Sequence, residues 1–453
     1  MHLFFPSALA SLVAIATILA ALSSAANATE SDSITQLREE IKAIQTEYDA
    51  RMRRLEQRLH QAETAAKSVE ITKQTSTPQT QPTPFSLPLS LILSGSYSNL
   101  SQDPAGYEIT GYGRHNQPSP YGRGFSLAES ELNLSGNVDA YFRAAATLAL
   151  LPDNSFAVEN AYVQTSGLGD GWGITAGRFF SGIGYLNAQH KHAWDFVDEP
   201  LAYRALLGGQ FALDAVQATW LAPADSFLQL GAEAGRGLNF FAPAADKNGA
   251  DLATLFVKTG GDMGDSVSWL GGLSLLRTAP KNLQWDEVSL AGIPTTNAYT
   301  GSSRLVLANF VLKWSPDGNP AERNFKLQGE YLRLSESGTV VHDLAAANTI
   351  GNYAARREGG YVQGIYQFTR GWRAGLRYDR LSGGGVDYGA NNINLPRSDY
   401  HPSRASTMLD YSPSEFSRIR LQLGRDRSRQ GATDNQLFVQ YQMSLGAHGG
   451  HKY

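Results

Sequence analysis

The sequence lacks several features that whole classes of protein require. It has no cysteine among its 453 residues, so neither disulfides nor thiolate ligands contribute to its structure. It has no nucleophile elbow, Ser-His-Asp arrangement or phosphate-binding loop among its expected strands, so we expect neither an enzyme nor a bound cofactor. It has no basic tract or nucleic-acid-binding motif, and its formal net charge is only −4, so nucleic acid is not an expected partner.

Long apolar runs are also scarce. The only one, residues 8–22, is too short for a comfortable transmembrane helix and precedes Ala26-Asn27-Ala28, which suits cleavage after Ala28. We therefore predict a signal peptide over residues 1–28, although residues 1–6 contain no Lys or Arg. No later segment is expected to cross a membrane as a helix.

Residues 29–88 predict two segments without a globular core. Apolar residues at steps of three and four, from Ile34 to Leu59, predict a short coiled-coil helix within residues 29–68. A solvated single helix is the alternative, although isolated helices of this length are marginal in water. Residues 69–88 are rich in Thr, Gln, Pro and Ser and predict a disordered linker.

From residue 89 onward, apolar and polar side chains alternate. In residues 372–379, Trp372, Leu376 and Tyr378 occupy one parity, and Arg373 and Arg377 the other. A period of two predicts strands with one apolar and one hydrated face. One face is consistently apolar, the other is polar or charged, and the pattern continues to the C-terminus. It therefore indicates a transmembrane β-barrel with lipid outside and water inside.

The fold class is therefore all-β: an antiparallel transmembrane barrel of about 16 strands over residues 89–453, preceded by the coiled coil. Short connections mostly alternate with long ones, among them residues 181–207 and 335–357. This alternation is typical of bacterial outer-membrane barrels and places the N-terminal coil in the periplasm. A barrel of this size leaves a water-filled bore, so we expect diffusion of small hydrophilic solutes. A non-conducting barrel that anchors a periplasmic coil is an alternative.

Charged side chains on the hydrated parity are the candidate pore-lining residues. Residues 351–450 contain thirteen arginines, no lysine and eight acids, and arginine binds carboxylate and phosphate groups through a bidentate fork. This predicts a basic wall that prefers anions, facing more acidic strands; alternatively, arginines and acids pair across strands without selectivity. The candidates are Arg373, Arg377, Arg418, Arg420, Glu129, Glu131 and Glu233.

Three sequence segments resemble phosphate-selective and DcaP-like porins: residues 124–139, Ala161-Tyr-Val-Gln-Thr-Ser166 and Ala176-Gly-Arg-Phe-Phe180. The resemblance implies a sixteen-stranded homotrimer in outer-membrane lipid, an N-terminal coiled coil and a lumen-facing Arg178. The chain is also similar to proteins labelled zinc-regulated TonB-dependent outer-membrane receptors. The terminal Tyr453 resembles the aromatic residue that barrel-insertion machinery recognises in outer-membrane proteins.

The long connection at residues 181–207 is the candidate constriction loop. In trimeric porins the corresponding loop folds into the bore, whereas the alternative is a loop exposed at the surface. Its charged and histidine residues are His190, Lys191, His192, Asp195, Asp198, Glu199 and Arg204. His190 and His192 are candidate zinc ligands, with Asp195 or Asp198 in support, because neutral imidazole binds zinc well. That site would favour a metal-linked uptake or receptor protein.

Overall fold

The computed structural model describes residues 89–113, 119, 121–238 and 248–446. The predicted signal peptide, coiled coil and linker, and Tyr453, lie outside the described residues. The chain divides into two units, residues 1–85 and 86–453, and all described residues belong to the second. No helix in this described part is long and apolar enough to cross a membrane.

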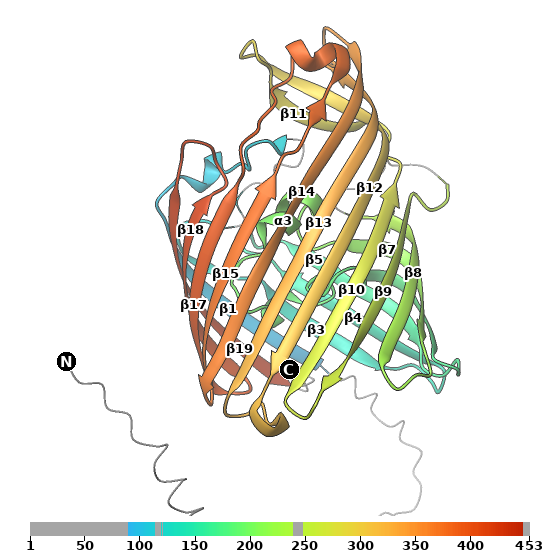
Figure 1. Cartoon of the computed structure of the whole chain (residues 1–453), viewed down its shortest axis with the longest axis vertical. Helices are drawn as coiled ribbons and strands as arrows, with labels where there is room; N and C mark the ends of the chain where they lie inside the picture. Colours follow the sequence, from blue (N-terminus) through green and yellow to red (C-terminus); the bar gives the residue numbers. More distant parts are fainter. Residues whose placement is uncertain (1–88, 114–118, 120, 239–247, 447–453) are drawn as a thin grey trace, which may run out of the picture. The chain divides into compact units, whose positions relative to one another are not determined.

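One sheet of nineteen strands, antiparallel in all its pairings, forms the unit, and pairing of β1 with β19 closes it into a barrel (Figure 1). Strands β2 and β3 both pair with β1 and form one interrupted wall strand, while β11 and β16 are side additions to β12 and β14. Sixteen wall positions remain, so the predicted strand number is confirmed.

The strands are β1 (Leu89–Leu100), β2 (Gly124–Leu127), β3 (Ser130–Asn137), β4 (Phe142–Leu150), β5 (Phe156–Thr165), β6 (Trp172–Phe180), β7 (Ala212–Leu221), β8 (Phe227–Gly237), β9 (Leu252–Met263), β10 (Val267–Thr278), β11 (Leu283–Val288), β12 (Pro294–Trp314), β13 (Asn324–His342), β14 (Thr349–Thr369), β15 (Trp372–Ser382), β16 (Val386–Asp387), β17 (Ser403–Ser414), β18 (Ser417–Arg427) and β19 (Asp434–Gly446). The helical turns are η1 (Pro104–Gly106), η3 (Lys191–Ala193), η4 (Pro316–Gly318) and η5 (Gly389–Ile393), and the α-helix is α3 (Leu201–Leu207).

The outer face of the wall is apolar. On β10, Leu273 is 53% exposed and its neighbour Ser274 only 2%; on β18, Leu421 is exposed while Arg420 is buried. Aromatic side chains gather on the outer face at the rim with short turns, where Trp172 lies beside Trp220 and Trp372 stacks on Tyr411. An apolar band edged by aromatic residues is the surface that a lipid bilayer covers, and the architecture is that of a porin-like outer-membrane barrel.

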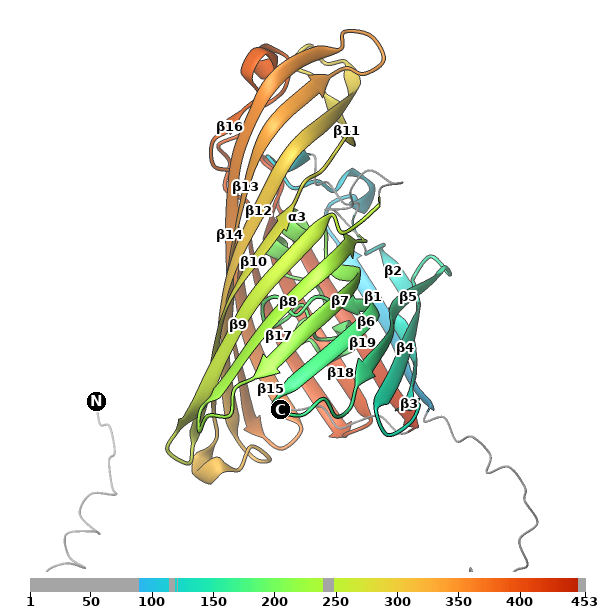
Figure 2. The ribbon, with the colours of Figure 1, turned by 90° about the vertical axis from the view of Figure 1, so that its right-hand side faces the viewer.

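Strands β12, β13 and β14 rise well above the rest of the wall on the side of the long loops (Figure 2). A separate apolar cluster lies in this extension, formed by Tyr299, Val340, Tyr353, Ala355, Tyr388 and Leu395. The strands of the extension begin or end well outside the limits that the alternation predicts. Above the membrane neither face of the sheet contacts lipid, so apolar and polar residues no longer mark the two faces.

Loop 181–207 lies inside the barrel. Its helix α3 lies within the ring of strands (Figure 1), and every residue of α3 is buried. The apolar side chains of α3 belong to one cluster with residues from the inner faces of β9, β10 and β12–β15. The wall residues of this cluster include Leu252, Leu276, Leu305, Leu307, Leu332, Leu334, Tyr361 and Leu381. One side of the bore is therefore filled by a hydrophobic core instead of water.

Candidate functional site

The segment that precedes α3 is held against the basic wall by its two aspartates. Asp195 lies 2.6 Å from Lys326 Nζ and 3.2 Å from Arg373 Nη1. Burial alone would raise its pKa, but these two cations hold the pKa of Asp195 well below its ordinary range. The carboxylate therefore stays ionised and joins the loop to β13 and β15.

Asp198 makes the second anchor. Its Oδ1 lies 2.7 Å from Arg377 Nη2 and its Oδ2 2.7 Å from Arg404 Nη1, and Gln422 donates to Oδ1 at 2.7 Å. Burial raises the pKa of Asp198, but the two guanidinium groups outweigh burial and lower it to about 2. Three wall strands, β15, β17 and β18, thus converge on one carboxylate of the loop.

The remaining wall arginines bind the loop through its backbone. Arg420 Nη2 donates to the carbonyl of Trp194 at 2.7 Å, and Arg418 Nη2 donates to the carbonyl of His192 at 2.6 Å. Asp410 lies 2.6 Å from Arg373 and 3.7 Å from Arg420. The four arginines proposed from the sequence as pore-lining thus lie on the inner face, where the loop covers them.

The acidic strands hold the other side of the loop. His192 Nδ1 lies 2.8 Å from Glu131 Oε1, and His190 Nδ1 lies 3.2 Å from Glu131 Oε2 and 3.1 Å from Glu159 Oε2. Lys191 donates to Glu129 at 2.6 Å. Burial lowers the pKa of His190, but the two carboxylates outweigh burial and raise it to about 10.

Two further glutamates fix the start of the loop. Glu233 accepts from the backbone N–H of Gly182 at 2.8 Å. Glu330 accepts from the N–H groups of Tyr185 and Leu186 and from the Tyr203 hydroxyl, at 2.9, 2.7 and 2.6 Å. Glu330 was not singled out from the sequence, although its inward parity on β13 was a usable signal.

The last two candidate residues of the loop, Glu199 and Arg204, are also placed inside the barrel. The backbone carbonyl of Glu199 accepts a hydrogen bond from Arg404. Arg204 is buried, and its guanidinium lies 4.6 Å from the ring centroid of Tyr107, which belongs to an outer loop. Neither residue is thus placed on an open surface.

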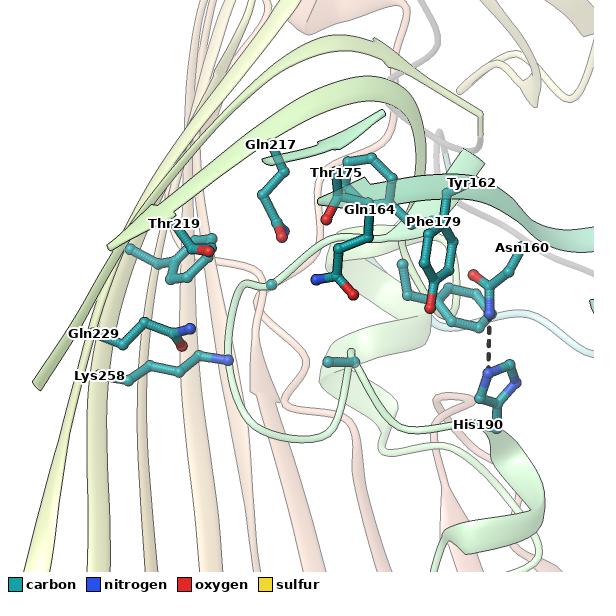
Figure 3. Close-up of a pocket in the computed structure, with 14 residues that line it drawn as sticks. Asn160, Tyr162, Gln164, Thr175, Phe179, His190, Gln217, Thr219, Gln229 and Lys258 are labelled. Carbon is teal, nitrogen blue, oxygen red and sulfur yellow. Dashed lines mark hydrogen bonds between the residues drawn. The ribbon is translucent and has the colours of Figure 1, made fainter. Parts of the chain in front are cut away.

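A cavity that is open to solvent lies between the loop and the inner faces of β5–β9, with about 730 Å³ of empty space including the solvent at its mouth (Figure 3). Most of its polar lining is uncharged: Asn160, Gln164, Thr175, Gln217, Thr219 and Gln229. Lys258 and His190 are its basic side chains, and the Asn160 amide lies 2.9 Å from His190 Nε2. The open part of the bore therefore lies beside β5–β9, away from the basic wall.

Arg178, expected from the resemblance to face the lumen, is placed on the outer face. It is in register with Asp214 and pairs with it at 2.8 Å, while the next pair in the register, Phe179 and Leu213, is buried inside. Adjacent residues of a strand face opposite sides, so an inward Phe179 requires an outward Arg178.

No family model matches the sequence. A protein of Aquifex aeolicus (strain VF5) named "Uncharacterized protein" is 33% identical over 352 residues, which cover 73% of this chain and 70% of that protein. The chain belongs to the family of this Aquifex protein. The match covers most of both chains, so the family relationship extends through most of the barrel.

Solved structures that this chain is similar to include several bacterial proteins. They include the outer membrane channel DcaP of Acinetobacter baumannii (12% identity, TM-score 0.48, 79% of this chain and 97% of that one). The trimer form of OmpT from Vibrio cholerae has 12% identity and a TM-score of 0.48 over 79% and 99% of the two chains. An anion-selective porin from Comamonas acidovorans has 11% identity and a TM-score of 0.47 over 80% and 99%. The porin-like architecture itself rests on the closed ring of strand pairings.

Proposed function

We propose that this barrel is a diffusion porin whose passage runs between loop 181–207 and the inner faces of β5–β9. The observation that carries the proposal is the asymmetry of the bore. Leucines and α3 fill the side next to β9–β15, whereas the cavity on the other side is lined mainly by amide and hydroxyl groups. As a solute passes, amide and hydroxyl groups can form the hydrogen bonds that its hydration water formed before.

The solutes we propose are small and hydrophilic, with only a mild preference for anions. The wall arginines at 373, 377, 404, 418 and 420, with Lys326, lie among aspartates 195, 198, 379, 410 and 426, so most of their charge is compensated. Lys258 is the lysine that lines the cavity itself. His190, the other basic side chain of the cavity, is paired with Glu131 and Glu159, so the charge of Lys258 is the main source of selectivity in the passage.

The test is the reversal potential of single channels in a planar bilayer under a salt gradient. We expect wild type to favour anions weakly and Lys258→Gln to reduce that preference, with the exposed Lys281→Gln as the matched control. Cation selectivity in wild type would refute the charge argument. Absence of conductance from a correctly folded barrel would favour the non-conducting anchor.

We also propose a homotrimer, with β5–β7 at the interface between subunits. The Arg178–Asp214 pair lies among outward-facing residues such as Val158, Ala161 and Val216. A charged group on a lipid face is costly, so cover by a neighbouring subunit would explain the pair. Light scattering in detergent should give three barrels per particle, and Asp214→Arg should weaken the assembly; monomeric wild type would refute the assignment.

A second candidate function is metal-linked uptake, favoured by one cluster. Ligand atoms of Glu131, His190 and His192 all lie within 4.8 Å of one another. Glu159 lies 3.1 Å from the imidazole of His190. Two imidazoles and a carboxylate are a donor set that zinc accepts. Protons compete for these nitrogens, so affinity should rise with pH. Calorimetric zinc titration of wild type and of His190→Ala/His192→Ala tests whether this cluster binds zinc, and His401→Ala is the control. Identical isotherms for wild type and the double variant would end the metal hypothesis.

A further inference from the structure

Three arginines lie in one row on the outer face of the wall. Arg277 on β10 is directly opposite Arg304 on β12, which is opposite Ser335 on β13, which in turn is opposite Arg356 on β14. All three arginine side chains are exposed. The row lies toward the rim of the long loops, because β10 ends one residue beyond Arg277 and continues into a long outer connection.

On β10 and β12 the row marks the upper edge of the apolar band. Two residues closer to the short-turn rim, the outward positions on these two strands are Leu275 and Val306, which face each other, while those on β13 and β14 are Arg333 and Glu358. Arg304 is ten residues from Trp314, the last residue of β12 at that rim. At about 3.3 Å per residue and a tilt of 35–45°, this separation is about 25 Å in height, which equals the usual height of the apolar band.

Charges of one sign directly opposite each other destabilise a sheet unless something compensates them. Within the described part of the chain, no ion pair is formed by Arg277, Arg304 or Arg356. The acid of the adjacent row, Glu358, is opposite Arg333 and accepts a hydrogen bond from Tyr331 at 2.7 Å. The described residues therefore leave the charge of the row uncompensated.

We propose that this row binds the phosphate groups of lipid headgroups in the outer leaflet. Neighbouring strands are about 4.8 Å apart, so Arg277 and Arg304 can contact one phosphate together. Arg356, two strands beyond Arg304, is about 10 Å away and suits a second phosphate. Acyl chains of the same lipid would then cover Leu275 and Val306, which a soluble anion would leave uncovered.

The test measures binding of lipid A with two phosphates to the purified barrel in neutral detergent, by native mass spectrometry. We expect Arg277→Gln/Arg304→Gln to bind at least about tenfold more weakly than wild type, because two charge-assisted contacts are lost. The matched control is Arg425→Gln on β18, an exposed outer-face arginine whose neighbours in the register are Ala405 and Asn435. It removes one exposed arginine charge, where the double variant removes two, and leaves the arginine pair intact, so it should bind nearly as wild type.

Three further measurements make the result unambiguous. In lipid-free neutral detergent the double variant should melt no lower than wild type, because it removes a repulsion; a lower melting temperature together with weak binding would indicate misfolding and overturn the assignment. Dephosphorylated lipid A should bind wild type and the double variant equally. Unchanged lipid A binding by the double variant would refute the proposal, and so would competition by millimolar inorganic phosphate, which would indicate a soluble-anion site. None of these outcomes depends on whether the bore conducts.

Discussion

Neutralising Asp198 should release the segment of loop 181–207 that precedes α3 without unfolding the barrel. In Asp198→Asn, Arg377 and Arg404 lose their shared carboxylate, although Asp379 still lies 3.0 and 3.7 Å from them. The lowering of the pKa from 3.8 to about 2 corresponds to roughly 2 kcal/mol. Removing one partner of a buried ion pair typically costs about 3–5 kcal/mol. We therefore expect the free energy that holds residues 194–200 in place to fall by about 2–5 kcal/mol.

The barrel should remain closed, because its sixteen wall positions and the apolar packing of α3 do not involve Asp198. Hydrogen exchange should accelerate in residues 194–200 and stay unchanged in the wall strands. Single-channel recordings should show a larger mean conductance with added substates. Asp225→Asn, at an exposed turn between β7 and β8, is the matched control and should behave as wild type.

The same anchor sets an acid limit. The pKa of Asp198 is lower in the folded loop than in a released one, so its stabilisation is complete above about pH 4 and is lost as pH falls through about 2. Wild-type exchange in residues 194–200 should thus be the same at pH 7 and pH 5. Equal exchange rates in wild type and Asp198→Asn at pH 7, with equal conductance, would refute the anchoring role.

Three other perturbations have clear expectations. The pKa of His190 is raised to about 10, so its stabilisation of the loop is complete below about pH 6.5 and is lost as pH rises through about 10; channel noise should grow over that window in wild type but not in His190→Ala. Leu206→Ala removes a fully buried side chain of α3 and should destabilise the seated loop by about 2–5 kcal/mol, measured by hydrogen exchange; no change would contradict the packed core. Gln217→Trp should reduce conductance because Gln217 lines the cavity, whereas Leu255→Trp on the outer face of β9 should not; equal effects would place the passage elsewhere.

The sixteen wall positions follow from local information alone. A period of two and the turn residues identify strands wherever lipid lies on one side and the interior on the other. The predicted ends of the strands are wrong where the wall no longer has lipid on one side and the interior on the other. The alternation predicts a long connection at residues 335–357, yet residues 335–342 extend β13 and residues 349–357 begin β14 in the high wall. Strands above the membrane pair through their backbones, so their side chains carry no lipid-facing signal.

The partners of the charged residues could not be predicted from the sequence. Parity gives the face on which Arg377 lies, but Asp198, its partner, is 179 positions earlier in the chain. Parity is also silent about what fills the interior. Leu305 and Leu332 are apolar on the inward parity, and only the folded loop explains them, because α3 packs against both strands in the same cluster.

A basic wall inside a barrel is therefore open to two physical meanings. Arginines that face open water attract anions to the bore. Arginines that bind a loop instead hold that loop inside the bore, where it narrows the passage. In this barrel the carboxylates and carbonyls of residues 192–199 bind the guanidinium groups of the wall. The charge of these arginines therefore holds the loop in place and does not attract anions to the bore. The outer row of Arg277, Arg304 and Arg356 differs because nothing in the described chain neutralises it. Charge that the protein leaves uncompensated, and not the number of arginines, indicates where an external anion binds.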